Sequence, residues 1–433
     1  MTTTIILAAI AIISMFICVI RFPMIKIKGL SFDTFYLPPL VIALVLIIFD
    51  LFDKTKLIET ISTNSSFNPL TILVLFICVS LLSIALDETG FFSFIAAWFV
   101  KKFNKSQYML FFILYALISV LTIFTSNDIV ILTFTPFILY FSKKGNINPI
   151  PFLVMEFVCA NTYSMLLPIG NPTNIYLTSI FEIDFISYIK VMILPTILCG
   201  IGSTTILLLL FKKSLDKKIE VFDIDNPVIK NKPLCIISLC HLGITTILLV
   251  IANYINIDMW KICLIFAISL LIFLSIFAII HKNANYVFGT VKRLPYNLIP
   301  FILSMFTIIM ALDSYNIFSY VYNLMDSINN DILQRITYLV SSTISCNILN
   351  NIPMTLAYGS ILSYTDNVGL IYATIIGSNL GAIITPIGAL AGIMWIRILK
   401  FNNIKYSFLD FMKNGVIIVI VLIVMTSIGL FFI

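Results

Sequence analysis

Residues 125–136 read TSNDIVILTFTP and place Ser126, Asn127 and Asp128 between two strongly apolar runs. The chain of 433 residues is 60% hydrophobic and only 11% charged, with a mean hydropathy of +1.09. Many of its apolar runs reach the length of about 17 to 25 residues that spans the hydrocarbon of a bilayer. We therefore expect an all-α polytopic integral membrane protein, in which three consecutive polar residues at this depth need a physical reason.

Ten apolar runs predict ordinary transmembrane helices, at about 4–20, 36–52, 67–86, 149–180, 188–211, 234–251, 258–280, 296–312, 369–399 and 415–433. Two further apolar regions, 107–141 and 333–363, are too long for one crossing. At about 1.5 Å per residue each spans about 45 to 50 Å, short of the roughly 60 Å that two crossings need. We predict that each forms a re-entrant hairpin, giving about ten transmembrane helices plus two hairpins.

The distribution of basic residues predicts the orientation of the chain. If 212–233 is a cytoplasmic linker, alternate loops bring 21 of the 26 lysines and arginines to the same side, as the positive-inside rule requires. Both termini are then extracytoplasmic, and the protein lies in the cell membrane, plasma or inner, as a multi-pass protein. This placement explains the net charge of +6 without a nucleic-acid partner.

The two halves of the chain resemble each other. ALDETGFFSF (85–94) matches ALDSYNIFSY (311–320), SNDIV (126–130) matches LNNIP (349–353), and LLPIGNP (166–172) matches ITPIGAL (384–390). We predict an N-terminal repeat at 1–211, with hairpin 107–141 and broken helix 149–180, and a C-terminal repeat at 234–433, with hairpin 333–363 and broken helix 369–399. Five crossings per repeat is an odd number, so the repeats have inverted topology, as in many secondary transporters.

Polar residues and helix breakers mark the predicted site at four related places. Thr125 to Asp128 form the tip of the first hairpin, where the Asn–Asp pair can also cap the returning helix, and Asn350 and Asn351 begin a helix just before Pro353. We expect the two tips to enter from opposite sides and to meet. The two broken helices are interrupted by Pro168, Gly170 and Pro172, and by Gly377, Gly381, Pro386 and Gly388.

Unwound backbone at membrane depth persists only where protein or a wet cavity satisfies it. The predicted substrate- or ion-binding residues are Ser126, Asn127, Asp128, Gly170, Asn171, Thr173, Asn174, Asn350, Asn351, Ser378, Asn379, Thr385 and Gly388. Asp128 and Glu156 are the proton-coupling candidates, although Glu156 could equally reach the aqueous interface. No lysine or arginine lies in this set, which favours a neutral or cationic substrate, or proton coupling through Asp128.

Other classes of protein are less consistent with the sequence. The eight cysteines include no CxxC pair and only two histidines are present, so we expect no metal site and no cofactor. The motifs HExxH and GxSG are missing, which argues against an enzyme. A passive channel needs a continuous pore, whereas helices broken in both repeats fit alternating access better.

Four segments resemble, in order, the signature segments of arsenite and antimonite efflux permeases of the ion transporter superfamily: SNDIVILTFTP (126–136), GNPTN (170–174), NNIP (350–353) and TPIGALAGIMWIRIL (385–399). The resemblance implies a two-hairpin, inverted-repeat transporter that exports trivalent metalloid in exchange for protons, sometimes with a separate pump ATPase. It assigns substrate and proton handling to Asn127, Asp128, Asn171, Thr173, Asn174, Asn350 and Asn351.

One segment departs from the permease pattern. Those permeases carry a segment like GDLGP, whereas GSNLGA stands at 377–382 and is closer to the sodium/proton antiporter and dicarboxylate branches. We therefore predict a proton-coupled secondary transporter of arsenite or antimonite, with a sodium/proton antiporter or a sodium-coupled di/tricarboxylate transporter as the alternative. Its partners are a small inorganic or organic ion, a coupling proton or sodium ion and the lipid bilayer, while a homodimer and a pump ATPase stay open.

Overall fold

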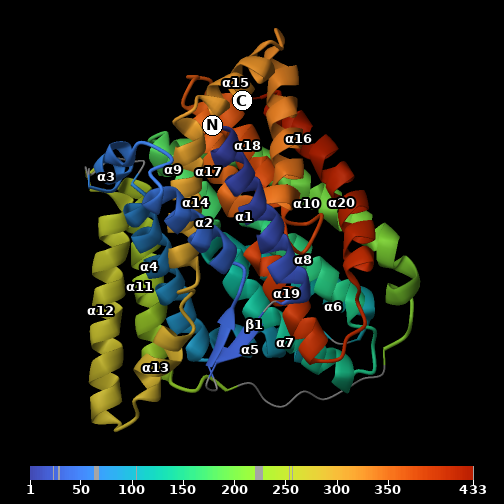
Figure 1. Ribbon diagram of the computed structural model, residues 1–433. Coiled ribbons are helices and arrows are strands. Elements are labelled where there is room, and N and C mark those ends of the chain that lie inside the picture. The colour runs from blue at the N-terminus through green and yellow to red at the C-terminus, as the bar shows by residue number, and fades with distance from the viewer. Residues whose placement is uncertain are drawn as a thin grey trace.

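The computed structural model describes residues 1–22, 24–27, 30–62, 68–103, 105–219, 228–252, 254–255 and 257–432. This part of the chain is almost entirely helical, so the expected all-α class is confirmed. The exception is a short antiparallel pair of strands, β1 (Met24–Ile27) and β2 (Leu30–Asp33), at the lower end of the molecule in Figure 1.

Seven helices in the described residues are long and apolar enough to cross a membrane. They are α1 (Thr2–Arg21), α4 (Pro69–Glu88), α6 (Gln107–Phe124), α10 (Phe185–Leu215), α11 (Lys232–Ile251), α12 (Met259–Ile280) and α20 (Phe408–Leu430). An eighth span is present if α14 (Leu298–Asp313) and α15 (Ile317–Asp326), which meet at 74°, are counted together. The molecule is therefore polytopic, and the count of ten crossings remains a prediction.

The other helices are shorter, because breaks interrupt several of the apolar runs. They are α2 (Leu37–Ile48), α3 (Lys54–Ser62), α5 (Phe91–Phe103), α7 (Asn127–Lys144), α8 (Ile150–Tyr163), the 3-10 turn η1 (Pro168–Gly170), α9 (Pro172–Ile180), α13 (Asn285–Lys292), α16 (Asp331–Leu349), α17 (Asn351–Leu362), α18 (Val368–Gly381) and α19 (Leu390–Phe401). Both predicted hairpin regions change helix near their middle, after Phe124 and at Asn350, and both predicted broken helices are interrupted.

Helices follow one another in corresponding order in the two halves, and their contacts are exchanged between the halves. Helix α2 packs against α14 while its counterpart α12 packs against α4, and α9 packs against α17 while α19 packs against α7. Figure 1 shows α5 and α7 at the lower end of the molecule, and α15 at the upper end near both termini. Such reciprocal contacts are what a two-fold relation between the halves produces, and the inverted repeats remain a prediction.

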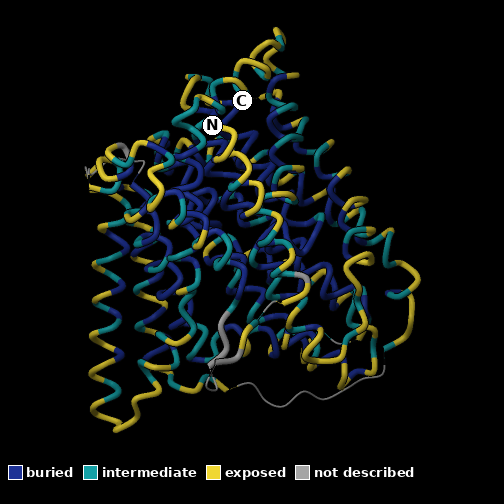
Figure 2. Tube along the Cα trace, viewed as in Figure 1, coloured by how far each residue is buried: buried dark blue, intermediate teal, exposed yellow. Residues whose placement is uncertain are grey.

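Burial separates a polar centre from an apolar rim. Helices α17 and α18 are buried along almost their whole length, whereas α11 and α12 expose their outer faces (Figure 2). The exposed positions of α12 recur every three or four residues and so form one face: Ile265, Ile268, Ile272, Ile276 and Ile279. Isoleucine on such a face matches lipid, which explains why the buried centre holds the polar groups instead.

Glycines let the first arm of the second predicted hairpin, α16, lie directly against α18. A Cβ atom built on Gly377 would lie 2.6 Å from the carbonyl oxygen of Leu339, and one built on Gly381 would lie 2.7 Å from that of Thr343. Real Cβ atoms do not approach backbone so closely, so any other residue at these positions forces the two helices apart. The glycines of GSNLG are therefore required by packing.

The substitution Gly377→Ala should destabilise the protein, because the added methyl group collides with the α16 backbone. Overpacking of this kind costs about 1–3 kcal/mol. The matched control is Gly243→Ala, since an added Cβ on Gly243 meets nothing within 4 Å. Thermal unfolding of the purified protein in detergent measures the difference, and equal midpoints for the two variants would contradict the close packing of α16 and α18.

Candidate functional site

The first broken helix is held open by its own asparagines. Asn171 caps α9 by accepting a hydrogen bond from the Thr173 N–H at 3.3 Å, and Pro172 occupies the first helical position, where no N–H is needed. Nδ2 of Asn174 donates to the carbonyl oxygens of Ser164 at 2.9 Å and Leu167 at 3.3 Å. These bonds satisfy backbone groups that the break removes from the helical pattern.

The second broken helix is held by the tip of the second predicted hairpin. Nδ2 of Asn350 donates to the Ile387 carbonyl at 2.8 Å, and the backbone N–H of Asn351 donates to the Gly388 carbonyl at 2.9 Å. Asn350 adopts a φ of +74° and a ψ of 153°, a backbone conformation that residues other than glycine rarely adopt, and caps α17. The tip and the break are therefore one hydrogen-bonded unit.

Asn347, one turn before this tip, extends the same unit. Its Nδ2 donates to the carbonyl oxygen of Gly381 at 3.1 Å, and its Oδ1 accepts from the Thr385 hydroxyl at 2.7 Å. The freed carbonyl at the end of α18 thus finds a donor on α16. Of the predicted site residues, Thr385 and Gly388 lie here.

Asn379 joins the two broken helices to each other. Its Oδ1 accepts from the Ser164 hydroxyl and from Nδ2 of Asn171, both at 3.0 Å, while its Nδ2 donates to Oδ1 of Asn174 at 2.8 Å. All four side chains are at most 1% exposed. A single amide therefore bridges helices that are more than 200 residues apart in the sequence.

A second bond crosses the same junction. The Ser378 hydroxyl donates to the hydroxyl of Thr173 at 3.1 Å. Gly170 lies close by, and a Cβ built on it would be 2.9 Å from Cα of Ser164, so the chain at this break admits only glycine. The predicted residues of both breaks are thus brought together.

The first predicted hairpin tip joins this centre through Asn161. Nδ2 of Asn127 donates to Oδ1 of Asn161 at 3.2 Å, and the Ser164 hydroxyl donates to the Asn161 carbonyl at 3.1 Å. The expectation that the Asn–Asp pair caps the returning helix is wrong: Ser126 is the N-cap. The side chain of Asn127 instead accepts from the Asp128 N–H at 2.9 Å, because serine at position 126 already has the extended backbone of a cap.

The hydrogen bonds place each tip against a broken helix, and Asn379 then connects the two breaks. We expected the two tips to meet; the structure instead links them through the broken helices.

Asp128 is partly buried beside the first tip, and it makes no ion pair with the basic residues that the structure describes.

Glu156 lies apart from these amides, in a fully buried position on α8. The Thr135 hydroxyl of α7 lies 2.9 and 3.0 Å from its two carboxylate oxygens, and Trp395 of α19 is close enough to interact with it. Because its exposed fraction is 0%, the alternative that Glu156 reaches the aqueous interface is wrong. Each of its neighbours comes from a helix that follows a tip or a break.

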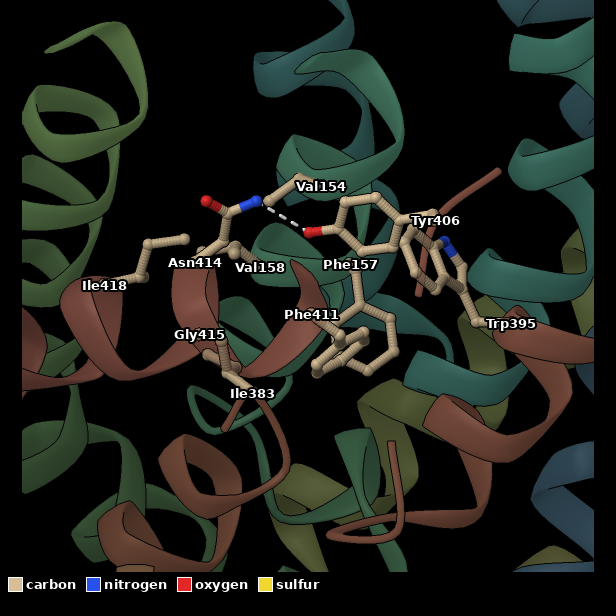
Figure 3. A pocket seen from close by; sticks show the side chains of 10 residues that line it. All are labelled: Val154, Phe157, Val158, Ile383, Trp395, Tyr406, Phe411, Asn414, Gly415 and Ile418. Atoms are coloured by element: carbon tan, nitrogen blue, oxygen red, sulfur yellow. Dashed lines mark hydrogen bonds between the residues drawn. The ribbon is translucent and has the colours of Figure 1, made fainter. Parts of the chain in front are cut away.

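Beside Trp395 is a small cavity of about 10 Å³, enough for roughly one water molecule. Figure 3 shows its walls, where Nδ2 of Asn414 donates to the Tyr406 hydroxyl at 2.8 Å between the rings of Phe157, Phe411 and Trp395. Trp395 thus lines this cavity and also lies near Glu156.

Asn347 is absent from the predicted set of site residues, and the sequence reasoning missed two further residues of the network, Asn161 and Ser164. The signal was the polar cluster ANTYS at 160–164, immediately before the break at LLPIG. The apolar pattern alone predicts an ordinary transmembrane helix here. Polar side chains inside such a helix need hydrogen-bond partners at membrane depth, so this cluster indicates a buried polar site.

A family model described as "CitMHS: Citrate transporter" matches residues 1–369 of the 433-residue chain. The chain belongs to this citrate transporter family. It is also 26% identical to the arsenical pump membrane protein of Escherichia coli, over 79% of this chain and 81% of that protein. A putative arsenical pump membrane protein of Bacillus subtilis is 24% identical over 83% and 86%, and a 46 kDa membrane protein of Mycobacterium leprae is 21% identical over 82% and 85%.

These similarities confirm the resemblance to arsenite and antimonite permeases and cover most of the chain. Together with the apolar helices, they identify a multi-pass membrane protein of the secondary transporter class. The citrate transporter family and the arsenical pump membrane proteins are named as transport proteins of the membrane rather than as enzymes.

Replacing Asn379 with alanine should weaken the junction of the two broken helices. It leaves Nδ2 of Asn171 buried without its partner, and such a group costs about 1–3 kcal/mol. The Ser164 hydroxyl and Oδ1 of Asn174 also lose a bond but keep Asn161 and Thr173 as partners. We expect a clear fall in the thermal midpoint of the detergent-purified protein and loss of transport. The control is Asn402→Ala, because Asn402 is exposed and donates only to the Ile398 carbonyl on its own helix. If the two variants unfold at the same temperature, Asn379 does not brace the site.

Proposed function

We propose that this protein exports trivalent arsenite or antimonite across the cell membrane in exchange for protons. One observation carries the proposal: the interrupted helices meet in a buried cluster of amide and hydroxyl side chains. Among the described residues of this cluster there is no lysine or arginine. The similarity to arsenical pump membrane proteins supports the same substrate class.

The chemistry of the cluster suits an uncharged, hydroxylated solute. Arsenous acid is neutral near pH 7 and carries three hydroxyl groups, each of which donates and accepts hydrogen bonds. Asparagine and threonine side chains offer both roles, so they can replace the water that such a molecule loses on entering the site. A citrate trianion instead calls for guanidinium or ammonium partners, which bind carboxylates most strongly.

Asp128 and Glu156 are the groups through which we propose proton coupling. Asp128 stands at the tip of the first predicted hairpin, and Glu156 is hydrogen-bonded by the Thr135 hydroxyl. A charged carboxylate without a cationic partner is costly at membrane depth, whereas a protonated one is not. Proton binding therefore changes the free energy of the helices that carry these groups, which is what coupling requires.

The second candidate is a sodium-coupled carrier of citrate or a related di/tricarboxylate. The match to the citrate transporter family and the GSNLGA segment favour it. In that case the helix N-termini at Ser126, Asn171 and Asn350 would have to bind the carboxylates without basic side chains.

Transport by the purified protein in proteoliposomes tests the proposal. An acidic lumen should drive accumulation of antimonite or arsenite, and a protonophore should abolish it. Asp128→Asn and Glu156→Gln should each reduce gradient-driven uptake by at least about tenfold, which corresponds to about 1.4 kcal/mol. The control is Asp366→Asn, because Asp366 is exposed in the loop before α18.

The same vesicles separate the alternatives. Sodium-driven uptake of citrate without metalloid transport would refute metalloid export and support the carboxylate carrier. Exchange of labelled for unlabelled substrate against its gradient would identify a carrier and refute a channel. Because the vesicles contain only this chain, transport there would also show that no pump ATPase is required.

A further inference from the structure

A larger cavity, of about 520 Å³, lies outside the amide cluster between both halves of the molecule. Its walls come from the end of α4, from α5, from one face of α7, from the linker segment before α11 and from the loop that precedes α14. They include Asp87, Glu88, Ser93, Thr133, Lys230 and Arg293. The helices α5, α7 and α13 around it lie at the lower end of the molecule in Figure 1, which the lysine distribution predicts to be cytoplasmic.

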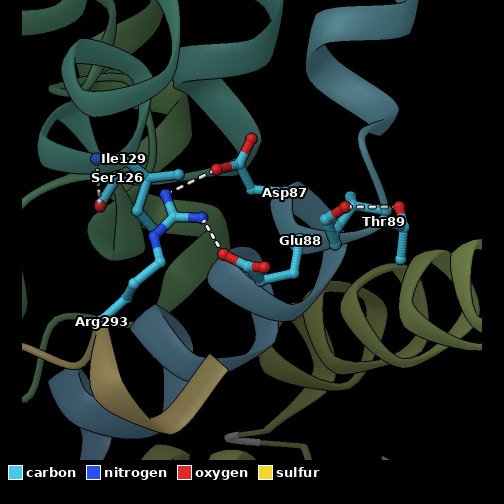
Figure 4. Close-up of polar contacts among 7 residues, drawn as sticks. Asp87, Glu88, Thr89, Ser126, Ile129 and Arg293 are labelled. Carbon is cyan, nitrogen blue, oxygen red and sulfur yellow. Dashed lines mark hydrogen bonds and ion pairs between the residues drawn. The ribbon is translucent and has the colours of Figure 1, made fainter. Parts of the chain in front are cut away.

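An ion pair connects two walls of this cavity. Nη2 of Arg293 lies 2.6 Å from Oδ2 of Asp87, and its Nη1 lies 2.6 Å from Oε1 of Glu88, so one guanidinium group holds two neighbouring carboxylates (Figure 4). Asp87 and Glu88 end α4 in the first half of the chain, and Arg293 precedes α14 in the second half. The pair therefore ties the halves together at this end.

The turn that carries the two carboxylates is also held from the linker side. The backbone N–H of Lys230 donates to the Thr89 carbonyl at 3.0 Å. Gly90 follows with a φ of +82°, a conformation that glycine adopts without strain, and a Cβ built there would be 3.5 Å from the Val228 carbonyl. The wall is thus a defined turn with bonds on two sides.

The cavity leads toward the first predicted hairpin tip. Leu132 and Thr133 of α7 line it, and Leu132 is four residues after Asp128, about 6 Å along the helix axis. Helix α7 packs against both α4 and α5, so the helices that line the cavity and the helix that begins at the tip form one packed unit. The lining of the cavity therefore comes within about one helical turn of Asp128 along α7.

The charges that line the cavity balance. Asp87 and Glu88 supply two negative groups, and Arg293 and Lys230 supply two positive ones. A balanced lining neither attracts nor repels an ion strongly at a distance, which suits an uncharged solute. This reading of the substrate rests on the proposed function.

The corresponding pair at the opposite end of the molecule would join Asp313 to a residue just before α4, and the sequence offers no arginine there. Asp313 aligns with Asp87, but residues 63–67, which align with the stretch before α14, read TNSSF and contain no basic residue. The residues 63–67 lie outside the described part of the chain. The arginine is therefore a feature of one end of the molecule only, as a gate that serves one side requires.

We propose that this cavity is the inner vestibule through which a small neutral solute reaches the first hairpin tip, and that the fork of Arg293 onto Asp87 and Glu88 is the latch that limits its opening.

Thiol labelling tests the vestibule without any substrate. Ser93→Cys and Thr133→Cys, each in a background with Cys18 and Cys240 replaced by serine, should react with a membrane-impermeant methanethiosulfonate in inside-out vesicles. The lipid-facing control Ile272→Cys and the opposite-end control Ser363→Cys should not react from that side. Equal reaction of Thr133→Cys and Ile272→Cys, or labelling of Ser93→Cys only from the Ser363 side, would overturn the vestibule.

The latch is tested by the rate of that labelling. Adding Arg293→Gln should increase the labelling rate of Thr133→Cys at least threefold. The double change Asp87→Asn with Glu88→Gln should have the same effect. Arg293→Lys should give a smaller increase, because lysine keeps the positive charge but loses the two-pronged guanidinium contact. Unchanged rates in folded, monodisperse variants would overturn the latch. The cavity residues could react with the thiol reagent although the protein transports neither arsenite nor antimonite. That result would refute metalloid export and still support the vestibule, so failure of the proposed function can be told from failure of the vestibule.

Discussion

The constraint on which this structure depends is the satisfaction of broken backbone inside a membrane. Wherever a helix is interrupted there, N–H and C=O groups lose their partners and no water replaces them. Asn171 and Asn174 supply such partners at the first break, and Asn350 supplies one at the second. The side-chain amide of Asn379 then joins the first break to α18 through Asn171 and Asn174. The residues that make the breaks possible are therefore the same residues that furnish a polar site, which explains why breaks and amides occur together.

The same asparagines therefore determine both how the broken helices pack and how polar the centre of the molecule is. Asparagines that brace the breaks leave the centre polar but uncharged. The carboxylate of Asp128 lies beside the first tip, and that of Glu156 lies apart from the amides, against Thr135. Charge balance continues in the proposed vestibule, where Arg293 and Lys230 are matched by Asp87 and Glu88. A route that is neutral along its length is consistent with an uncharged hydroxylated solute, moved by proton binding at a few acidic positions.

The sequence located the elements of the site well, because breaks at membrane depth need proline, glycine and cap residues that are visible in the sequence. The starts of α9 and α17 at Asn171 and Asn350 were predicted from such signals. It did less well with partners: Ser126 rather than Asn127 caps α7, and Asn161 was missed. Propensity identifies where a cap is needed, but the side chain that fills it depends on the local backbone.

What the sequence by itself determined was the membrane class, the positions of the breaks and the likeness of the two halves, since apolar length, proline and glycine act locally. Only the tertiary structure decided which groups meet. It joined the tips through the broken helices, buried Glu156 against Thr135, and brought Arg293 to Asp87. Those contacts link residues far apart in the chain, and their geometry depends on how whole helices pack, which no local pattern encodes.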